Sequence, residues 1–215
     1  MAAAPEEWEL HHQDETHVET NPYLSRVWHR VGAQPTLPAA GTNRRLTVFG
    51  SKEVCGRGRV EVVCAGQDSA CFAAYLAALE ARHRAAGRKV ILVLDNGPAH
   101  RSKDSRAALA ARAAWLEVIS LARYSPQLNE KEPEWRALKR DHRRRLAPSL
   151  RAFVDGLLDG LGRLGGERRD IVDAVPQWWL DGHRKPSTGR PPGRPKGTKD
   201  SCPRTRRSTN LPAPT

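Results

Sequence analysis

The chain has 215 residues, of which 39% are hydrophobic and 28% charged, and this composition excludes a chain too polar to fold. Lys and Arg total 36 against 24 Asp and Glu, so the net charge of +12 favours a polyanionic partner such as nucleic acid. The sequence shows neither a signal peptide nor an apolar run near the roughly 18 residues of a membrane span. It therefore predicts a cytoplasmic protein without membrane contact.

The basic charge is concentrated towards the C-terminal end. Residues 184–215 hold nine Lys and Arg against one acid, Asp200, and so carry +8 of the total +12. They also hold seven of the 16 prolines and show no helical or strand periodicity. This composition predicts a disordered basic tail. Residues 1–183 are predicted to form one folded domain.

Within this domain the predicted elements begin as strands and then alternate with helices. Strands are expected at 7–13, 25–31, 44–51 and 59–65. A helix capped by Asp68 or Ser69 follows and ends at Gly87. Further elements are a strand at 89–96, a helix at about 104–114, a strand at 116–121, and helices at about 130–146 and 149–163.

This order predicts an α/β fold, a ribonuclease-H-like mixed sheet flanked by helices. Antiparallel-type strands come first, and a β-α-β-α-β-α run follows. The rival is a flavodoxin-like doubly wound sheet, which needs a helix directly after the first strand. No helical pattern is visible between residues 14 and 44, so the ribonuclease-H-like sheet is favoured.

Two acids stand at the ends of predicted strands. Asp95 ends the apolar run VILVLD, at the sheet edge where open α/β sheets bind ligands and metals. Asp14 ends the weaker strand that precedes it. Each acid has a structural alternative, because a strand-end Asp often only caps a turn. The neighbouring His11, His12 and His17 do not suggest a zinc site, because adjacent strand residues face opposite ways.

A third acid lies at the start of the long basic helix. Asn129 can cap this helix, and Glu132 follows three residues later at the capping-box position. Glu132 is therefore either part of a helix cap or a metal-binding carboxylate. On spacing alone, Glu130 and Glu134 compete for the second role.

Two segments, VILVLDNGPAH and YSPQLNEKEPEWRALK, resemble the DDE domain of bacterial insertion-sequence transposases. The similarity is to the insertion-sequence-630 family, which is related to the mariner superfamily, and it covers roughly residues 8–146. Matching positions of the two motifs are Asp95, Asn96, His100, Tyr124, Ser125, Pro126, Leu128, Asn129, Glu132, Trp135, Leu138 and Lys139. Upstream, Gln13-Asp14-Glu15-Thr16 matches the first acidic motif, and Trp28 and Val48-Phe49-Gly50 fall where the family has similar residues.

The resemblance implies a catalytic domain that cleaves DNA and transfers DNA strands in transposition. It implies that Asp14, Asp95 and Glu132 hold two Mg²⁺ ions, for which Mn²⁺ can substitute, with Asp14 as the bridging ligand. Carboxylate oxygens suit this hard cation. Asn96, His100 and Asn129 are expected to support the acids or to contact phosphate. A homodimer is expected from the resemblance alone.

The expected partner is double-stranded DNA at the transposon ends and at the target. Expected DNA contacts on and after the basic helix are Arg136, Lys139, Arg140, Arg143 and Arg144. The alternative is a solvated helix face. In the tail, GRPPGRPKG is similar to an AT-hook, in which Arg194 would enter the minor groove.

The sequence departs from the family pattern in three respects. Glu130 and Lys131 replace a proline and an apolar residue, and the first strand is unusually polar. The helix-turn-helix region that binds inverted repeats is missing, so a truncated copy is expected. Two other functions therefore stay open: a catalytically silent remnant that only binds DNA, and a repair nuclease of the same fold.

Overall fold

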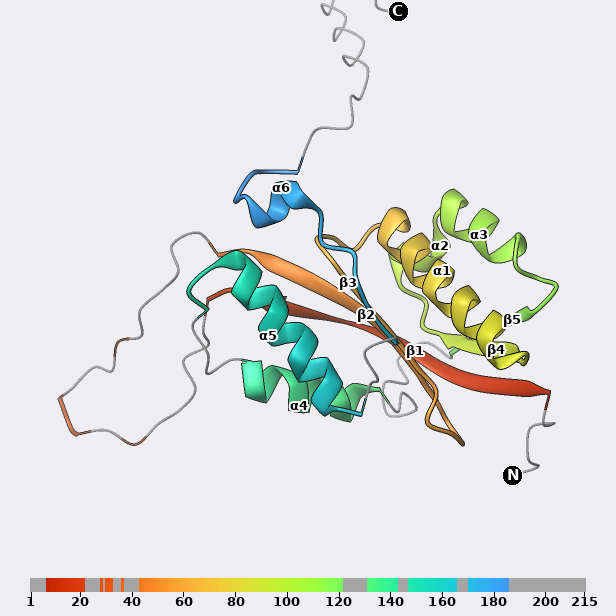
Figure 1. The fold of residues 1–215 in the computed structure, drawn as a ribbon, viewed down its shortest axis with the longest axis horizontal. Coiled ribbons are helices and arrows are strands. Elements are labelled where there is room, and N and C mark those ends of the chain that lie inside the picture. Colours follow the sequence, from red (N-terminus) through yellow and green to blue (C-terminus); the bar gives the residue numbers. More distant parts are fainter. Residues whose placement is uncertain are drawn as a thin grey trace, which may run out of the picture. The chain divides into compact units, whose positions relative to one another are not determined.

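The computed structural model describes residues 7–21, 28, 30–32, 36, 43–121, 131–142, 147–165 and 170–185. These residues form a six-stranded sheet with helices on both faces (Figure 1). The strands are β1 (Trp8–Glu19), β2 (Arg45–Glu53), β3 (Arg59–Cys64), β4 (Lys89–Leu94), β5 (Leu116–Ser120) and β6 (Ile171–Asp173). The helices are α1 (Ser69–Ala86), α2 (Pro98–Arg101), α3 (Lys103–Ala110), α4 (Glu132–His142), α5 (Leu150–Arg163) and α6 (Gln177–Leu180).

The sheet has the strand order β5-β4-β1-β2-β3-β6. β1, β2 and β3 are antiparallel neighbours, whereas β4 is parallel to β1 and β5 is parallel to β4. β6 adds a short parallel strand next to β3. The predicted mixed sheet is thereby confirmed. A doubly wound sheet is excluded, because β2 and β3 add two antiparallel strands beside β1.

Two apolar cores lie on opposite faces of the sheet. The first, here called the α1-side core, joins β2, β3 and β4 to α1 through residues such as Phe49, Leu92 and Phe72. The second, the α5-side core, joins β1 and β2 to α4, α5 and α6 through residues such as Val48 and Leu157. Figure 1 shows α1, α2 and α3 on one side of the strands and α4 and α5 on the other.

β1 changes its buried face in the middle of the strand. Glu9, His11 and Gln13 are buried in its first half, whereas Thr16 and Val18 are buried in its second half. β2 accounts for the second half, because Val48 pairs with Thr16 and belongs to the α5-side core. Alternation along a strand then places the side chain of Asp14 on the α5 side and that of Glu15 on the α1 side.

The first long helix begins and ends where the sequence predicts. The carboxylate of Asp68 accepts a hydrogen bond from the Cys71 backbone amide at 3.0 Å, which caps α1. Gly87 ends the helix in the left-handed conformation, with φ of 67°.

Two strand predictions need correction. β1 does not end near Asp14 but runs to Glu19, because these polar-looking residues keep pairing with β2. The strand predicted at 25–31 is absent at its described positions: Trp28, Arg30 and Val31 are not in a strand. The strand that follows β1 in the described chain and pairs with it is β2.

The helices differ from prediction mainly at their ends. α3 stops at Ala110, several residues before the expected end, and turns lead from it into β5. α4 spans Glu132–His142, and the rest of the helix predicted at 130–146 lies outside the described residues. α5 agrees with its prediction, whereas β6 and α6 were not predicted. Trp179 of α6 is buried in the α5-side core.

Most of the predicted basic tail, residues 186–215, lies outside the described residues, and the boundary at 183 stays a prediction. Among the described helices, none combines the length and apolar character needed to cross a membrane.

Candidate functional site

Asp14 and Asp95 come from neighbouring parallel strands. β1 pairs with β4 in a register that reaches His12 opposite Val93, and two residues further along each chain stand Asp14 and Asp95. β4 ends at Leu94 while β1 continues, so Asp95 leaves the sheet beside Asp14. The structure therefore brings two of the three predicted acids together at the carboxyl end of β4.

Asp14 is held in surroundings that disfavour its negative charge. Burial raises the pKa of this carboxyl from 3.8 to about 6, and the charges of Glu15 and Asp95 act in the same direction. The Trp135 indole lies beside the carboxyl, although the buried Nε1 of Trp135 has no partner in hydrogen-bond geometry. A bound cation would relieve this repulsion, and carboxylate oxygens suit a hard divalent ion.

Asp95 and Glu15 share one histidine from the other face of the sheet. His100 Nε2 lies 2.8 Å from Glu15 Oε1 and 3.3 Å from Asp95 Oδ1. Although burial opposes its charge, these two carboxylates raise the pKa of His100 to about 9. His100, together with the Gly97 backbone amide, holds the pKa of Asp95 below its ordinary value. His100 is therefore a buried cation that orients the Asp95 carboxylate.

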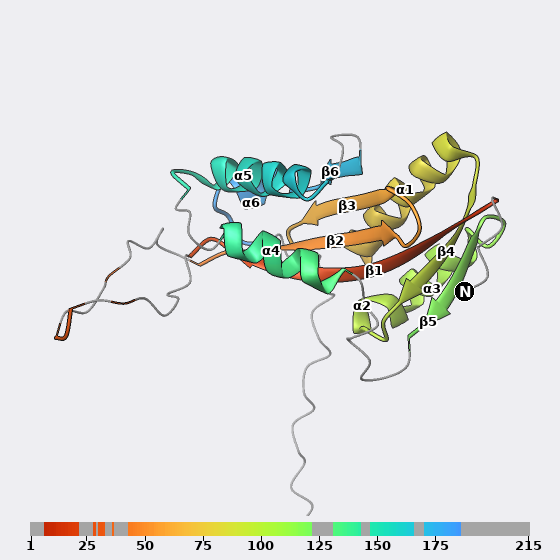
Figure 2. The same ribbon diagram turned by 90° about the horizontal axis from the view of Figure 1, so that it is seen from below.

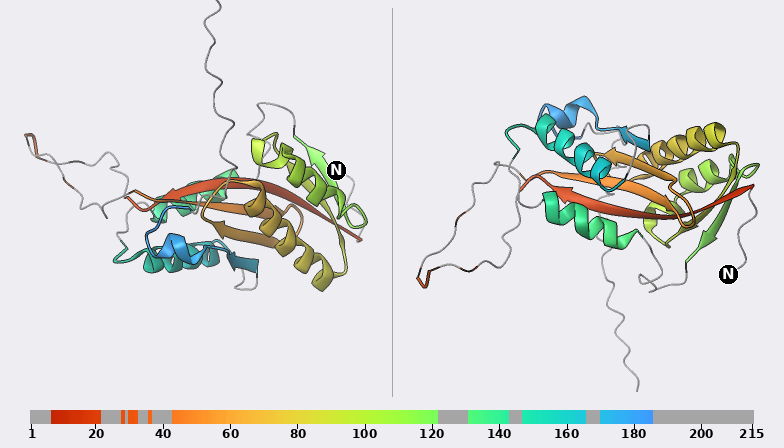
Figure 3. Two further views of the ribbon diagram at one scale, coloured as in Figure 1. Left: turned by 90° about the horizontal axis from the view of Figure 1, so that it is seen from above. Right: turned by 60° about the horizontal axis from the view of Figure 1, so that its bottom comes forward.

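The helix that carries Glu132 is packed tightly on the strands of the site. In Figures 2 and 3, α4 lies along β1. Gly50 of β2 pairs with Asp14, and a Cβ atom at Gly50 would lie only 2.5 Å from Cη2 of Trp135. Glycine is therefore required here, because the indole occupies the space of a side chain. This contact fixes α4 against β1 and β2 beside Asp14.

A buried ionic network holds the first turn of α4. Lys131 is fully buried, and its Nζ lies 2.7 Å from Glu61 of β3 and 2.9 Å from Glu134. Arg59 of β3 also binds Glu134 and Glu61. Lys131 further lies 4.7 Å above the Trp135 ring. The lysine that departs from the family pattern is thus a structural residue, compensated by Glu61.

Glu132 is the first residue of α4, and its position is more exposed. Its side chain is 44% exposed, and Oε1 lies 3.2 Å from Arg136 one turn later. Within the described ranges, no three His, Cys, Asp or Glu side chains are placed to hold a metal ion together. The structure therefore joins Asp14 to Asp95 and leaves Glu132 at the head of the helix that packs on their strands.

The other predicted site residues have varied surroundings. Asn96 donates from Nδ2 to the Leu121 carbonyl at 2.8 Å, which ties the end of β4 to the end of β5. Lys139 and Arg140 lie in the last turn of α4. Asn129, Arg143, Arg144 and Arg194 lie outside the described residues.

Sequence reasoning gave Glu15 and Trp135 no role in the site. Both lay in the motifs that carried the resemblance, but only the structure shows them against His100 and Asp14.

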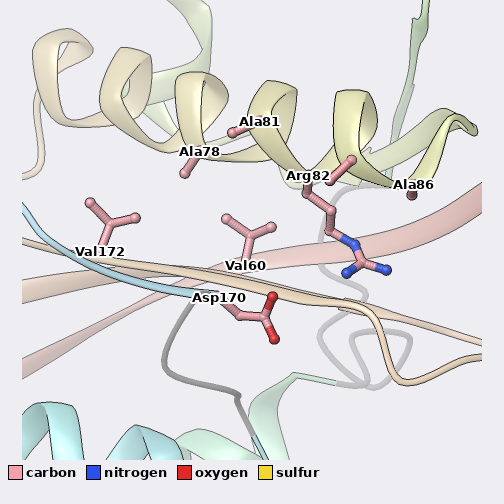
Figure 4. Close-up of a pocket in the computed structure, with 8 residues that line it drawn as sticks. Val60, Ala78, Ala81, Arg82, Ala86, Asp170 and Val172 are labelled. Carbon is pink, nitrogen blue, oxygen red and sulfur yellow. The ribbon is translucent and has the colours of Figure 1, made fainter.

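A separate groove lies on the α1 side of the sheet. It has a volume of about 380 Å³, and alanines of α1 face Val60 and Val172 across it (Figure 4). Arg82 and Asp170 are its charged lining residues. None of the three predicted acids lines this groove, so it is distinct from the site at Asp14 and Asp95.

Comparisons with known proteins agree with this arrangement. Two solved structures share the fold with TM-scores of 0.52: a Mos1 transposase paired-end complex with the left transposon end, at 21% identity, and a Mos1 strand transfer complex, at 18%. They cover 75% and 73% of this chain, which spans 49% and 51% of theirs, about half their length. No curated protein matches the sequence. Residues 9–154 match the family described as DDE superfamily endonuclease. The chain therefore belongs to the DDE superfamily of endonucleases.

Proposed function

We propose that this chain is the catalytic domain of an insertion-sequence transposase, related to the insertion-sequence-630 family, that cleaves and joins DNA. The observation that carries the proposal is the Asp14–Asp95 pair at the ends of neighbouring parallel strands, where burial, followed by the charges of Glu15 and Asp95, raises the pKa of Asp14 to about 6. A buried carboxyl group beside other carboxylates is stabilised when a cation or a proton neutralises it.

Endonucleases of this superfamily use divalent metal ions. Asp14, Asp95 and Glu132 would hold two Mg²⁺ or Mn²⁺ ions in this chain. When bound, such ions activate the attacking oxygen and stabilise the departing one at phosphorus. Glu132 would complete the site by exchanging its contact with Arg136 for the metal, which its exposed position at the head of α4 permits.

The remaining residues act by position and charge. His100 and the Gly97 amide fix one oxygen of Asp95, so the carboxylate is oriented before metal or DNA arrives. Trp135, seated on Gly50, and the Lys131 network hold α4 at Asp14. In strand cleavage, a water oxygen would bond to phosphorus while the bond to the 3′ oxygen breaks. The new 3′-hydroxyl would then bond to a phosphorus of the target DNA and lose its proton, while the bond from that phosphorus to the 3′ oxygen of the target strand breaks and leaves a 3′-hydroxyl on the target.

DNA is the proposed partner, with Arg136, Lys139 and Arg140 as backbone contacts on α4. Arg143, Arg144 and Arg194 stay proposed contacts on the basis of sequence. A homodimer is proposed from the family resemblance. Because the chain spans about half the length of the Mos1 structures, recognition of specific transposon ends is not assigned to it.

A second candidate function is a silent remnant that binds DNA without cutting it. The observation in its favour is Glu132, which is paired with Arg136 and, in the described part of the chain, is not grouped with the other two acids.

Nicking of supercoiled plasmid by the full chain distinguishes the two functions. The transposase proposal expects nicking with Mg²⁺ or Mn²⁺ and none with a chelator. Asp95→Asn and Glu132→Gln should abolish it, whereas Asp159→Asn on the exposed face of α5 should not. Plasmid binding without any metal-dependent nicking by the unaltered chain would instead support the remnant.

A further inference from the structure

A basic pocket lies beside the open edge of β1, beyond the point where β4 ends. It has a volume of about 250 Å³, and its lining includes His17 and Glu19 of β1, Arg45 of β2, and Lys139 and His142 of α4. Asp14, Asp95 and Glu132 are not among its lining residues. It is therefore a separate feature from the acid pair.

Two cations of this pocket have no acidic partner in the described structure. Neither Arg45 nor Lys139 forms an ion pair with a described carboxylate. The acid that lines the pocket, Glu19, instead accepts a hydrogen bond from Asn43 at 2.9 Å. Burial, followed by the charges of Arg45 and Lys139, lowers the pKa of His17, so both cations project a positive field onto it. The pocket is thus a concave site with excess positive charge.

The pocket lies at the same distance from the acids along two elements. His17 comes three positions after Asp14 in β1, a rise of about 10 Å. Lys139 comes seven positions after Glu132 in α4, also a rise of about 10 Å. Each strand of a DNA duplex carries one phosphate for about 3.4 Å of axial rise, so phosphates follow one another closely along its surface. One bound duplex can therefore present one phosphate to the acids and another to the pocket.

We propose that this pocket binds a backbone phosphate of DNA about 10 Å from the acid pair, with Arg45 and Lys139 as its ligands. A guanidinium group matches the geometry of phosphate oxygens, and an ammonium group adds a second charge-assisted contact. His17 lines the pocket but is not assigned as a ligand, because its Nδ1 lies 3.1 Å from the Thr47 hydroxyl. The inference rests on the proposed function, because it assumes that DNA lies across the acids.

The test is DNA binding by the full chain in a chelator, measured by fluorescence anisotropy with a labelled duplex of mixed sequence at about 50 to 200 mM salt. Arg45→Gln and Lys139→Gln should each weaken binding about tenfold at low salt. Each should also reduce the slope of log Kd against log salt by about one. Glu19→Gln should tighten binding, because it removes a negative charge from the pocket.

The matched control is Arg84→Gln on α1. Arg84 is an exposed cation near the amino end of β4, at the opposite edge of the sheet from Asp95. It should leave affinity and slope nearly unchanged. Thermal unfolding of each variant separates lost binding from lost folding, and Arg45→Lys should keep the slope in a folded protein. The inference would be overturned if folded Arg45→Gln and Lys139→Gln both kept the wild-type slope of log Kd against log salt. It would also be overturned if Arg84→Gln lost as much DNA affinity as these two variants.

The binding assay contains no divalent metal, so its outcome does not depend on cleavage. If the wild-type chain never nicks plasmid, but Arg45→Gln and Lys139→Gln reduce the slope of log Kd against log salt, the proposed function is refuted and the phosphate pocket is supported. A chain that nicks plasmid and binds DNA equally well with or without Arg45 and Lys139 refutes the pocket alone.

Discussion

The most informative single change is Asp14→Asn in the metal-free protein. The pKa of Asp14 is raised from 3.8 to about 6, mainly by burial and then by the charges of Glu15 and Asp95. A raised carboxyl pKa means that stability is full below the unfolded pKa and is lost as the pH rises through the folded pKa. The window is therefore about pH 4 to 6, and above it the ionised carboxylate destabilises the fold.

The size of the effect follows from the shift. A rise of about two pKa units corresponds to about 3 kcal/mol at pH 8. Asp14→Asn should therefore stabilise the metal-free protein by up to about 3 kcal/mol at pH 8, or roughly 6 to 12 °C in Tm. At pH 4 the gain should disappear, because wild-type Asp14 is then protonated and neutral.

The assay is thermal unfolding in a chelator between pH 4 and pH 8, followed by the same series with Mg²⁺. Mg²⁺ should raise the Tm of the wild type more than that of Asp14→Asn, because only the wild type has the full carboxylate pair. Asp95→Asn is the matched variant, and its expected change in stability has the opposite sign. The lowered pKa of Asp95 stabilises the fold above the unfolded pKa, so this variant should be less stable at pH 8.

The reasoning would be refuted if Asp14→Asn were no more stable than the wild type at pH 8 in the chelator. It would also be refuted if the gain were equally large at pH 4, since a pH-independent gain reports packing and not charge.

Two further predictions concern the packing of α4 against the sheet. Gly50→Ala should destabilise the protein by about 1 to 3 kcal/mol in urea unfolding and lower nicking, because its methyl group would overlap Trp135. The control is Gly156→Ala in α5, where a Cβ meets no atom within 4 Å. This variant should be as stable as the wild type, or more stable, in the same assay. Equal losses for the two glycines would show that packing against Trp135 is unimportant. Lys131→Met should cost about 3 kcal/mol, because it removes one of the two cations that hold the buried Glu61 carboxylate, and adding Glu61→Leu should recover part of that loss. A double variant no more stable than the single one would contradict the compensation.

The sequence predicted the sheet best where burial and pattern agree. The strand before Asp95 is an apolar run, and its Val90, Leu92 and Leu94 pack with residues of α1 and α3 in the α1-side core. β1 was harder, because its two halves bury opposite faces and its buried positions include Glu9 and His11. Such a strand lacks a regular alternation, and its extent was fixed only by pairing with β2.

The candidate site likewise has features that the sequence predicted and features that only the structure revealed. The position of Asp95 followed from a strand end and from the resemblance, whereas that of Asp14 followed from the resemblance alone, because β1 runs past it to Glu19. The link through His100 could not be predicted, because it joins side chains from β1, the β4 end and α2. The compensation of Lys131 by Glu61 depends on residues 70 positions apart and was equally hidden. The segment at 25–31 shows the reverse error, since its described residues, Trp28, Arg30 and Val31, are not in a strand despite the strand-like pattern.

The central claim is that the carboxylates of residues 14, 95 and 132 share one metal centre. Anomalous diffraction from crystals of the full chain soaked in Mn²⁺ tests it most directly. The account predicts metal density between Asp14 and Asp95, with Glu132 released from Arg136 to become a ligand. Density away from these side chains, or Glu132 still paired with Arg136 at full metal occupancy, would contradict it.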